Sequence, residues 1–283
     1  MASQDAQASE MAVETAYVDM PSGRTYYEVT GAGHPFLMIH ADVADRRMWD
    51  EQFATFAQRY RVIRYDKRGF GKTTSQGGPV SLIEDIVALL KHLGISKTYI
   101  MGLSNGGRLA LDFTLAHPEL VDALIVVAGG VTGLEDSATE AEMAVFGQYE
   151  TLQANNDGAG LLALGIHVWC DGPTQPEGRA AQEVRDRIRT MMTDTYHDHH
   201  EKLEPIELEP AAVGRLTELA VPTLVILGSY DFSGTNAAME FLAEHVNGAR
   251  KAVFETAHMV NMEQPAAFDA LVQEFLDTVS ATA

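Results

Sequence analysis

The chain has 283 residues, of which 46% are hydrophobic and 21% are charged, a composition that is typical of globular proteins in water. Forty acidic residues against 20 basic ones give a formal net charge of −20, and the resulting negative field repels phosphate backbones and anionic lipid surfaces. We therefore expect no nucleic acid and no membrane as partners, and a small substrate that is neutral or weakly charged. The apolar runs are far shorter than the roughly 20 residues that a membrane-spanning helix needs.

The beginning of the chain and its cysteine content bear on the cellular compartment. Residues 1–12 contain no Lys or Arg and no apolar segment, so they are predicted to form a solvated tail and not a secretory signal. The single cysteine, Cys170, cannot form an internal disulfide. Both observations favour a cytoplasmic protein.

The first predicted element is a β-hairpin over residues 16–29, with its turn at 20–23. After it, short apolar runs alternate with segments of helical spacing, as expected for a mostly parallel sheet covered on both faces. The predicted strands after the hairpin are 36–40, 61–65, 98–101, 124–127, 223–227 and 251–254, and the predicted helices are 48–58, 81–93, 105–117, 236–246 and 265–279. We expect an α/β fold with an eight-stranded, mostly parallel sheet flanked by helices.

The interval 131–219 breaks this alternation. It shows helical patterns near 135–154 and 177–201, turns at 155–160 and 171–176, and no convincing strand. A long helical segment between two strands of one sheet predicts an inserted cap. The core domain is then expected to comprise residues 13–130 and 220–283, with the cap at 131–219.

A nucleophile motif lies between the predicted strand 98–101 and the predicted helix 105–117. It is the pentapeptide Gly102-Leu103-Ser104-Asn105-Gly106. A strand that turns at once into a helix holds its central residue in strained dihedral angles, and small residues two positions before and after it keep the neighbouring backbone clear. The string alone is common in a chain with 24 glycines, so the strand before it and the helix after it carry the interpretation. Ser104 is the predicted nucleophile.

A serine nucleophile needs a base within hydrogen-bond reach and an acid that orients this base. Asp231 comes shortly after the predicted strand 223–227, and His258 comes after 251–254. The order Ser, Asp, His, with each residue at the carboxyl end of a strand, is the order of the α/β hydrolases. Glu135 or Asp136 is an alternative acid, but neither lies so close to the end of a strand.

On these residues the chain resembles the α/β-hydrolase superfamily. Within it, the chain is similar to the small bacterial esterases and lactonases grouped with 3-oxoadipate enol-lactonase and the cofactor-free haloperoxidases. The likeness covers nearly the whole chain outside the tail and the cap. It rests on the segments Ile39-His40-Ala41-Asp42, Tyr65 to Lys72, Gly102 to Gly107, Leu227 to Asp231, and His258 with Glu263 and Pro265.

The resemblance implies a catalytic triad and an oxyanion hole. Ser104 is the nucleophile, His258 the general base and then acid, and Asp231 the carboxylate that fixes the imidazole tautomer. The oxyanion hole comprises two backbone N–H groups, one from Asn105 and one from Asp42, with Ala41 as the nearer alternative. No cofactor and no metal are implied.

Asp42 departs from the pattern of the relatives, which commonly show His-Gly followed by a neutral residue. A carboxylate beside a developing oxyanion opposes it, unless the side chain turns away, pairs with Arg46 or Arg47, or stays protonated. We expect the side chain of Asp42 to point away from the reacting centre while its N–H serves as the donor.

The substrate pocket is expected to use aromatic and methionine side chains. The predicted pocket residues are Met143, Phe146 and Trp169 from the cap and Met259 beside the base, with Tyr149, Met191 and Met192 as further cap residues.

Other polar groups and the cysteine have structural interpretations. His40, Asp66 and Arg68 are expected to brace their loops, and Glu263 to shape the turn after the base. His197 and His200 share a helix face, but no distant third ligand is evident, so a solvated helix is favoured over a metal site. Cys170 lacks an elbow and a nearby base, and is expected in the pocket or the core.

The predicted activity is hydrolysis of a carboxylic ester or lactone through an acyl-enzyme. Perhydrolase or haloperoxidase-type chemistry and carbon–carbon bond hydrolysis are alternatives on the same triad. The carbon–carbon hydrolases usually carry an aromatic residue where this chain has Met259. A ligand sensor with slow turnover is an alternative of another class. The oligomeric state is not predicted.

Overall fold

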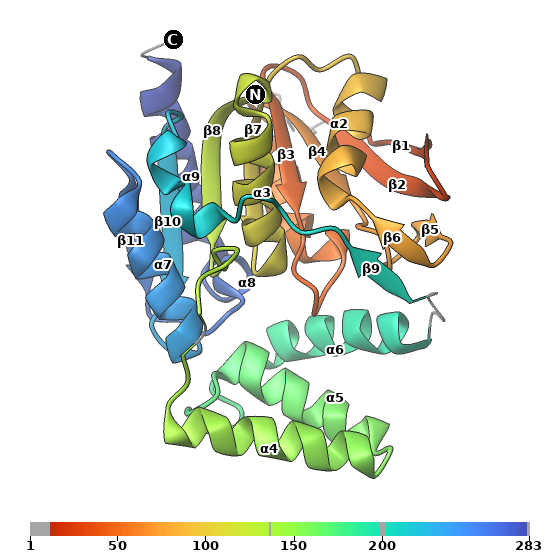
Figure 1. Ribbon diagram of the computed structural model, residues 1–283, viewed down its shortest axis with the longest axis vertical. Coiled ribbons are helices and arrows are strands. Elements are labelled where there is room, and N and C mark those ends of the chain that lie inside the picture. The colour runs from red at the N-terminus through yellow and green to blue at the C-terminus, as the bar shows by residue number, and fades with distance from the viewer. Residues whose placement is uncertain (1–11, 136, 198–201, 282–283) are drawn as a thin grey trace, which may run out of the picture.

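One large sheet forms the centre of the computed structural model, which describes residues 12–135, 137–197 and 202–281 (Figure 1). Eight strands run in the order β1-β2-β4-β3-β7-β8-β10-β11, and the short strand β5 pairs with β2 as a ninth. β2 pairs antiparallel with β1 and β4, whereas the neighbours from β4 to β11 pair in parallel. The expected α/β fold with a mostly parallel sheet is confirmed. The strands are β1 (Glu14–Met20), β2 (Gly23–Thr30), β3 (Pro35–Ile39), β4 (Arg61–Tyr65), β5 (Thr74–Ser75), β7 (Thr98–Leu103), β8 (Val121–Val127), β10 (Thr223–Gly228) and β11 (Arg250–Phe254).

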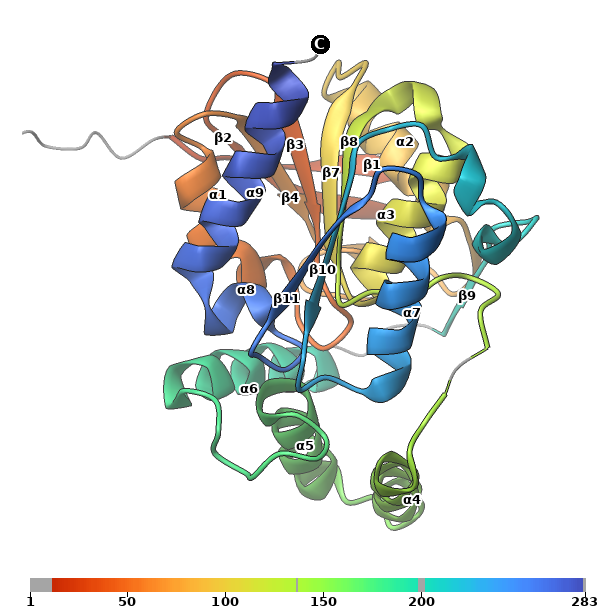
Figure 2. The same cartoon turned by 90° about the vertical axis from the view of Figure 1, so that its left-hand side faces the viewer.

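Helices cover both faces of this sheet. Figure 2 shows α1 and α9 on one face and α2, α3 and α7 on the other. The short helix α8 leads into α9. These helices are α1 (Asp50–Phe56), α2 (Leu82–His92), α3 (Asn105–Ala116), α7 (Ser233–His245), α8 (Val260–Glu263) and α9 (Pro265–Ser280).

Burial follows the apolar runs of the sequence. Every residue of β7 and of β10 is buried, as expected for inner strands of a parallel sheet with helices on both faces. Helix α2 directs Ile86, Leu89 and Leu90 into the core. Its N-terminus is capped by the hydroxyl of Ser81, which accepts the N–H of Glu84 at 3.2 Å.

Three helices lie together beyond one end of the sheet (Figures 1 and 2). They are α4 (Glu140–Ala154), α5 (Gly158–Ile166) and α6 (Gln182–His197). Helix α4 begins with a capping box formed by Thr139 and Glu142. Helix α5 continues into a single π-helical turn over His167–Asp171. The sequence pattern missed α5, because the glycines at its start indicated a turn.

A short strand corrects the expectation that the interval 131–219 contains none. This strand, β9 (Leu203–Pro205), pairs in parallel with β6 (Gly78–Val80) in a separate two-stranded sheet. Three residues that include Glu and Pro show no apolar alternation, so the pattern does not predict a strand here.

Candidate active site

Ser104 lies at the sharp turn between β7 and α3. Its backbone has φ 61° and ψ −128°, a region that costs a non-glycine residue about 1–3 kcal/mol. The N–H of Ser104 holds the turn by donating to the carbonyl oxygen of Val127 at 2.9 Å. The motif glycines are required by space: a Cβ at Gly102 would lie 2.0 Å from the carbonyl oxygen of Gly106, and a Cβ at Gly106 would lie 2.5 Å from that of His40. The turn therefore has the geometry that the pentapeptide predicts.

His258 and Asp231 form a buried, hydrogen-bonded pair. Nδ1 of His258 lies 2.6 Å from Oδ2 of Asp231, and the two side chains are 2% and 0% exposed. Oδ1 of Asp231 accepts the N–H of Phe232 at 2.8 Å. Because a carboxylate only accepts, we assign the proton to Nδ1, which leaves the lone pair on Nε2.

The Nε2 atom of His258 is buried and has no hydrogen-bond partner among the described residues. It is therefore not bonded to Ser104 in this structure, although both residues line the same cavity. Hydrogen bonds between a nucleophile and its base are often long without substrate and tighten in the reacting complex. The arrangement leaves Nε2 able to accept a proton.

The order of the strands explains why these residues meet. β10 and β11 are neighbours, so Asp231, which follows β10, lies beside His258, which follows β11. Gly228 at the end of β10 permits the approach, since a Cβ there would lie 2.2 Å from the carbonyl oxygen of Ala257. Only β8 separates β7 from β10, which brings Ser104 to the same edge of the sheet.

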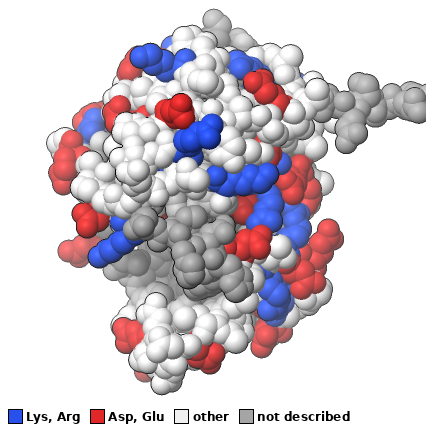
Figure 3. Space-filling view, turned by 90° about the vertical axis from the view of Figure 1, so that its right-hand side faces the viewer, with Lys and Arg blue, Asp and Glu red and all other residues white. Residues whose placement is uncertain are grey.

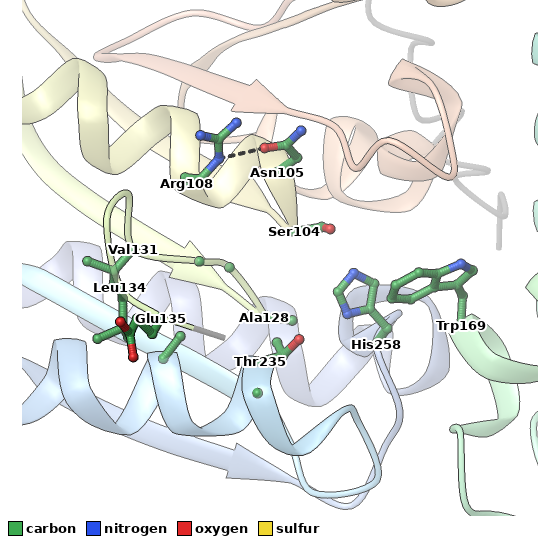
Figure 4. Close-up of a pocket in the computed structure, with 14 residues that line it drawn as sticks. Ser104, Asn105, Arg108, Ala128, Val131, Leu134, Glu135, Trp169, Thr235 and His258 are labelled. Carbon is green, nitrogen blue, oxygen red and sulfur yellow. Dashed lines mark hydrogen bonds between the residues drawn. The ribbon is translucent and has the colours of Figure 1, made fainter. Parts of the chain in front are cut away.

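Ser104 and His258 line a cavity of about 310 Å³. Figure 4 shows these two residues at one end, with Trp169 beside the imidazole, and Leu134 and Glu135 at the other end. The ring centroids of Trp169 and His258 are 4.7 Å apart. The other lining residues are Asn105, Arg108, Ala128, Gly129, Gly130, Val131, Gly234, Thr235 and Ala238.

Of the four main predicted pocket residues, Trp169 alone lines this cavity. Met143 is 58% exposed on α4, and Phe146 stacks on Phe232 with ring centroids 5.5 Å apart. Met259 is fully buried in the hydrophobic core.

Within 131–219, the other residues that line this cavity are Val131, Leu134 and Glu135. Of the further expected residues, Tyr149 on α4 and Met192 on α6 line a neighbouring cavity with Asp42 and Trp169. The position of the π-helical turn that carries Trp169 depends on tertiary packing, which helical spacing does not encode.

Two charged residues of the cavity wall were not predicted as pocket residues. Arg108 lies on α3, four residues after Ser104. This spacing could have predicted Arg108 as a pocket residue, because it places both residues on one side of the helix. Glu135 was considered only as an alternative to Asp231. The carboxylate that accepts from His258 is that of Asp231, and Asp136 lies outside the described residues.

Asp42 bonds two neighbours, and neither is the expected arginine. Its Oδ1 accepts from Nζ of Lys67, and its Oδ2 accepts from Nδ2 of Asn105. Burial alone raises the pKa of this carboxyl group, but Lys67 and Asn105 outweigh burial and hold the pKa of Asp42 below its ordinary value. Arg46 and Arg47 pair with other carboxylates, namely Glu28, Asp66, Asp45 and Asp194. The suggestions of an arginine partner and of a protonated Asp42 are therefore wrong.

Strand order also explains this polar cluster. β4, β3 and β7 are adjacent in the sheet, and Lys67, Asp42 and Asn105 follow these strands in turn. The side chain of Lys67 is only 3% exposed, so its ammonium group depends on Asp42 for compensation. The cluster continues along α3, because Oδ1 of Asn105 accepts from Nε of Arg108 at 2.8 Å.

The backbone N–H groups near Ser104 differ in whether they already donate a hydrogen bond within the protein. The N–H of Ala41 donates to the sulfur of Met48 at 3.2 Å. Within the described chain, the N–H groups of Asp42 and Asn105 donate to no other residue. Asn105 is the first residue of α3, where helical N–H groups lack a partner in their own helix. The arrangement favours Asp42 over Ala41 as a donor toward a ligand.

The loop-bracing roles are observed. Burial lowers the pKa of His40 to about 3, so the ring is neutral. Its Nε2 accepts the N–H of Lys67 at 2.9 Å, and its Nδ1 lies 2.7 Å from the carbonyl oxygen of Ala41. Asp66 and Arg68 bond within the core, to Arg46 and Lys72 and to Asp85, respectively.

The cysteine and histidine predictions have different outcomes. Cys170 is a fully buried core residue, and burial raises the pKa of its thiol to about 12. The side chain of His197 and all of His200 lie outside the described residues. Across the described ranges, no group of three or more His, Cys, Asp or Glu residues is placed to hold a metal ion.

No helix in the described part of the chain has the length and apolar character needed to cross a membrane.

Charged side chains of both signs are mixed on the molecular face that Figure 3 shows. Blue and red groups lie beside one another there, and the acidic excess of the chain is not gathered into a single patch on this face. On this face, neighbouring opposite charges offset one another at short range.

Residues 34–265 match the family model described as alpha/beta hydrolase fold, and the chain belongs to this family. Within it, 3-oxoadipate enol-lactonase 2 of Acinetobacter baylyi is 27% identical over 229 residues, which is 80% of this chain and 82% of the relative. RutD of Azorhizobium caulinodans is 34% identical over 260 residues, 88% of this chain and 94% of the relative. The solved structure of a thermophilic esterase from Thermogutta terrifontis is similar with a TM-score of 0.73 at 24% identity, covering 94% of this chain and 99% of the esterase.

Proposed function

We propose that this protein hydrolyses a carboxylic ester or lactone of a small molecule through an acyl-enzyme on Ser104. The observation that carries the proposal is the buried His258–Asp231 pair, in which Nε2 of His258 has no partner among the described residues and the imidazole lines the same cavity as a serine held at a strained turn. Similarity to an enol-lactonase and an esterase supports this class of substrate.

The proposed reaction begins with attack of the Ser104 hydroxyl on the carbonyl carbon. Its proton passes to Nε2 of His258, and Asp231 stabilises the imidazolium that forms. His258 then protonates the leaving alcohol oxygen. In the second half, His258 takes a proton from water, the hydroxide adds to the acyl carbon, and Ser104 leaves with its proton restored.

The oxyanion is proposed to accept hydrogen bonds from the N–H groups of Asn105 and Asp42, which have no partner within the described chain. Each such donor contributes about 3 kcal/mol to transition-state stabilisation. The carboxylate of Asp42 is directed to Lys67 and to the Asn105 side chain. This pairing supports the role of Asp42 as a backbone donor despite its charge.

The cavity supports a small substrate. Its volume of about 310 Å³ lies at the lower end of the range for small-molecule sites. Trp169 lies against His258 at the catalytic end, which supports our proposal that residues 131–219 act as the cap of a core formed by 13–130 and 220–283. The net charge of −20 supports a neutral or weakly charged substrate.

The test is hydrolysis of p-nitrophenyl esters and aliphatic lactones of graded acyl length by the wild type and by Ser104→Ala. We expect multiple turnovers of at least one short substrate by the wild type and a loss of about 10⁴-fold or more in Ser104→Ala. Ser81→Ala, at the N-cap of α2, is the matched control and should keep its activity. Wild-type rates for Ser104→Ala would refute the proposal.

A further inference from the structure

One arginine of the cap bonds the turn that carries Trp169. Arg179 lies between the π-helical turn and α6. Its Nε donates to the carbonyl oxygen of Asp171 at 2.6 Å, and its Nη2 donates to that of Cys170 at 2.8 Å. These carbonyl groups belong to the last two residues of the turn. Arg179 therefore helps to fix the turn that places Trp169 against His258.

The same guanidinium group reaches the loop of the base. Its Nη2 lies 2.7 Å from Oε2 of Glu263, while Oε1 of Glu263 accepts the N–H of Ala257 at 2.7 Å. Ala257 directly precedes His258. The side chain of Glu263 is only 7% exposed, so its charge depends on Arg179 for compensation. Through Glu263, the cap is connected to the backbone that carries His258.

A third contact reaches the loop of the acid. Cζ of Arg179 lies 4.9 Å from the ring centroid of Tyr230, which directly precedes Asp231. Gly172, just after the π-helical turn, also packs against this loop, since a Cβ there would lie 2.5 Å from the carbonyl oxygen of Tyr230. The cap thus contacts the acid loop through both the Arg179 side chain and the Gly172 backbone.

We propose that Arg179 is a positioning residue, which couples docking of the cap to the geometry of His258 and Asp231. The inference rests on the proposed function. Arg179 does not line the cavity with Ser104, so it acts through Glu263, Tyr230 and the π-helical turn. A lysine cannot replace it fully, because one ammonium group lacks the planar fork that reaches several acceptors at once.

The test compares Arg179→Gln with a matched cap arginine. Arg187 on α6 also pairs with a glutamate outside the cap, the exposed Glu51, at 2.6 Å. Arg187 contacts neither the base loop nor the acid loop. In Arg179→Gln we expect kcat to fall about tenfold or more with KM within roughly threefold, because displaced reacting groups lower the chemical rate. Arg179→Lys should recover part of the loss, and Arg187→Gln should stay within about twofold of the wild type.

Acrylamide quenching of tryptophan fluorescence gives a readout that is independent of activity. The chain has two tryptophans, and Trp49 is fully buried, so quenching reports mainly on Trp169. We expect about twofold stronger quenching in Arg179→Gln and no change in Arg187→Gln.

Two outcomes would overturn the inference. In the first, Arg179→Gln folds and its kcat and quenching match those of the wild type. In the second, Arg187→Gln loses as much kcat as Arg179→Gln. If Arg179→Gln does not fold, Glu263→Gln takes its place, because it keeps an acceptor for Ala257 and removes the charge that Arg179 pairs with. If the wild type hydrolyses no ester or lactone, the proposed function fails, and the quenching comparison still decides whether Arg179 fixes the turn.

Discussion

The two walls of the cavity differ in how they are built. The core wall includes residues that follow a strand, such as Ser104, Ala128 and His258, and the order of the strands sets their spacing. The cap wall contributes Trp169 from a π-helical turn, whose place is set by contacts such as that between Arg179 and Glu263. Under the proposed function, we expect the sheet to set the positions of the reacting groups, and cap docking to control what enters the site and how firmly the base is held.

After the loss of Ser104 itself, the largest effect is expected behind the core wall, in Asp231→Asn. The amide cannot stabilise the imidazolium and favours the wrong tautomer of His258, so kcat should fall by about 10³–10⁴-fold. Steady-state kinetics on a short ester measures this loss. Glu135→Gln is the comparison, since Glu135 lines the cavity without bonding His258, and its kcat should stay within about tenfold of the wild type. A greater loss in Glu135→Gln would reassign the acid.

The next effect concerns the charge beside the oxyanion hole. Lys67→Met removes the cation from Asp42 and should lower kcat by about 10–100-fold, because an unpaired carboxylate opposes the oxyanion. Asp42→Asn alone should change kcat by less than about tenfold, and Asp42→Asn combined with Lys67→Met should recover most of the loss. A tenfold or greater increase in Asp42→Asn at neutral pH would contradict the pairing, since it would mean that the charge acts on the reaction in the wild type.

At the cap wall, Trp169→Ala should alter substrate preference more than the chemical step. Loss of the indole enlarges the cavity beside His258, and we expect kcat/KM to shift by about tenfold in favour of bulkier acyl groups. A series of esters of graded size measures the shift. Phe146→Ala is the matched control, because Phe146 stacks on Phe232 outside the cavity lining. An equal shift in both variants would indicate that the effect comes from a less stable cap and not from the lost indole in the cavity.

The smallest effect on catalysis is expected at Asp112, on α3 away from the cavity that holds Ser104. Burial raises the pKa of Asp112 to about 6 from an ordinary value of 3.8, and its Oδ1 is buried without a partner among the described residues. The folded state therefore holds the proton more tightly than the unfolded chain, and stability falls as pH rises between about 4 and 6.

Asp112→Asn should remove this cost without changing kcat. The amide oxygen of the asparagine can take the place of Oδ2, which accepts from the hydroxyl of Thr132 at 2.6 Å. We expect the free energy of unfolding to rise by up to about 3 kcal/mol at pH 8 and to change little at pH 4. Urea denaturation at the two pH values measures the difference. An equal gain at both pH values would show that ionisation of Asp112 is not the cause.

The predictability of the site follows the same division between core and cap. That Ser104, Asp231 and His258 lie together can be predicted from sequence, because each stands just after an apolar run and parallel strands bring their carboxyl ends to one edge. The partner of Asp42 was not found, because Lys67 follows a strand whose place beside β3 is known only from the sheet order. Met143 and Phe146 had suitable chemistry, but their side chains do not line the cavity that holds Ser104. Arg179 gave no signal, since its contacts join segments far apart in the chain.

The most direct test of the central claim is labelling of the folded protein with a fluorophosphonate, followed by peptide mass spectrometry. The reagent reacts with a serine only when a base activates its hydroxyl and an oxyanion hole receives the phosphoryl oxygen. The account predicts one adduct, on the peptide that contains Ser104, and its absence in His258→Ala. No adduct at Ser104 under conditions that label a control esterase, or equal labelling of other serines, would contradict it.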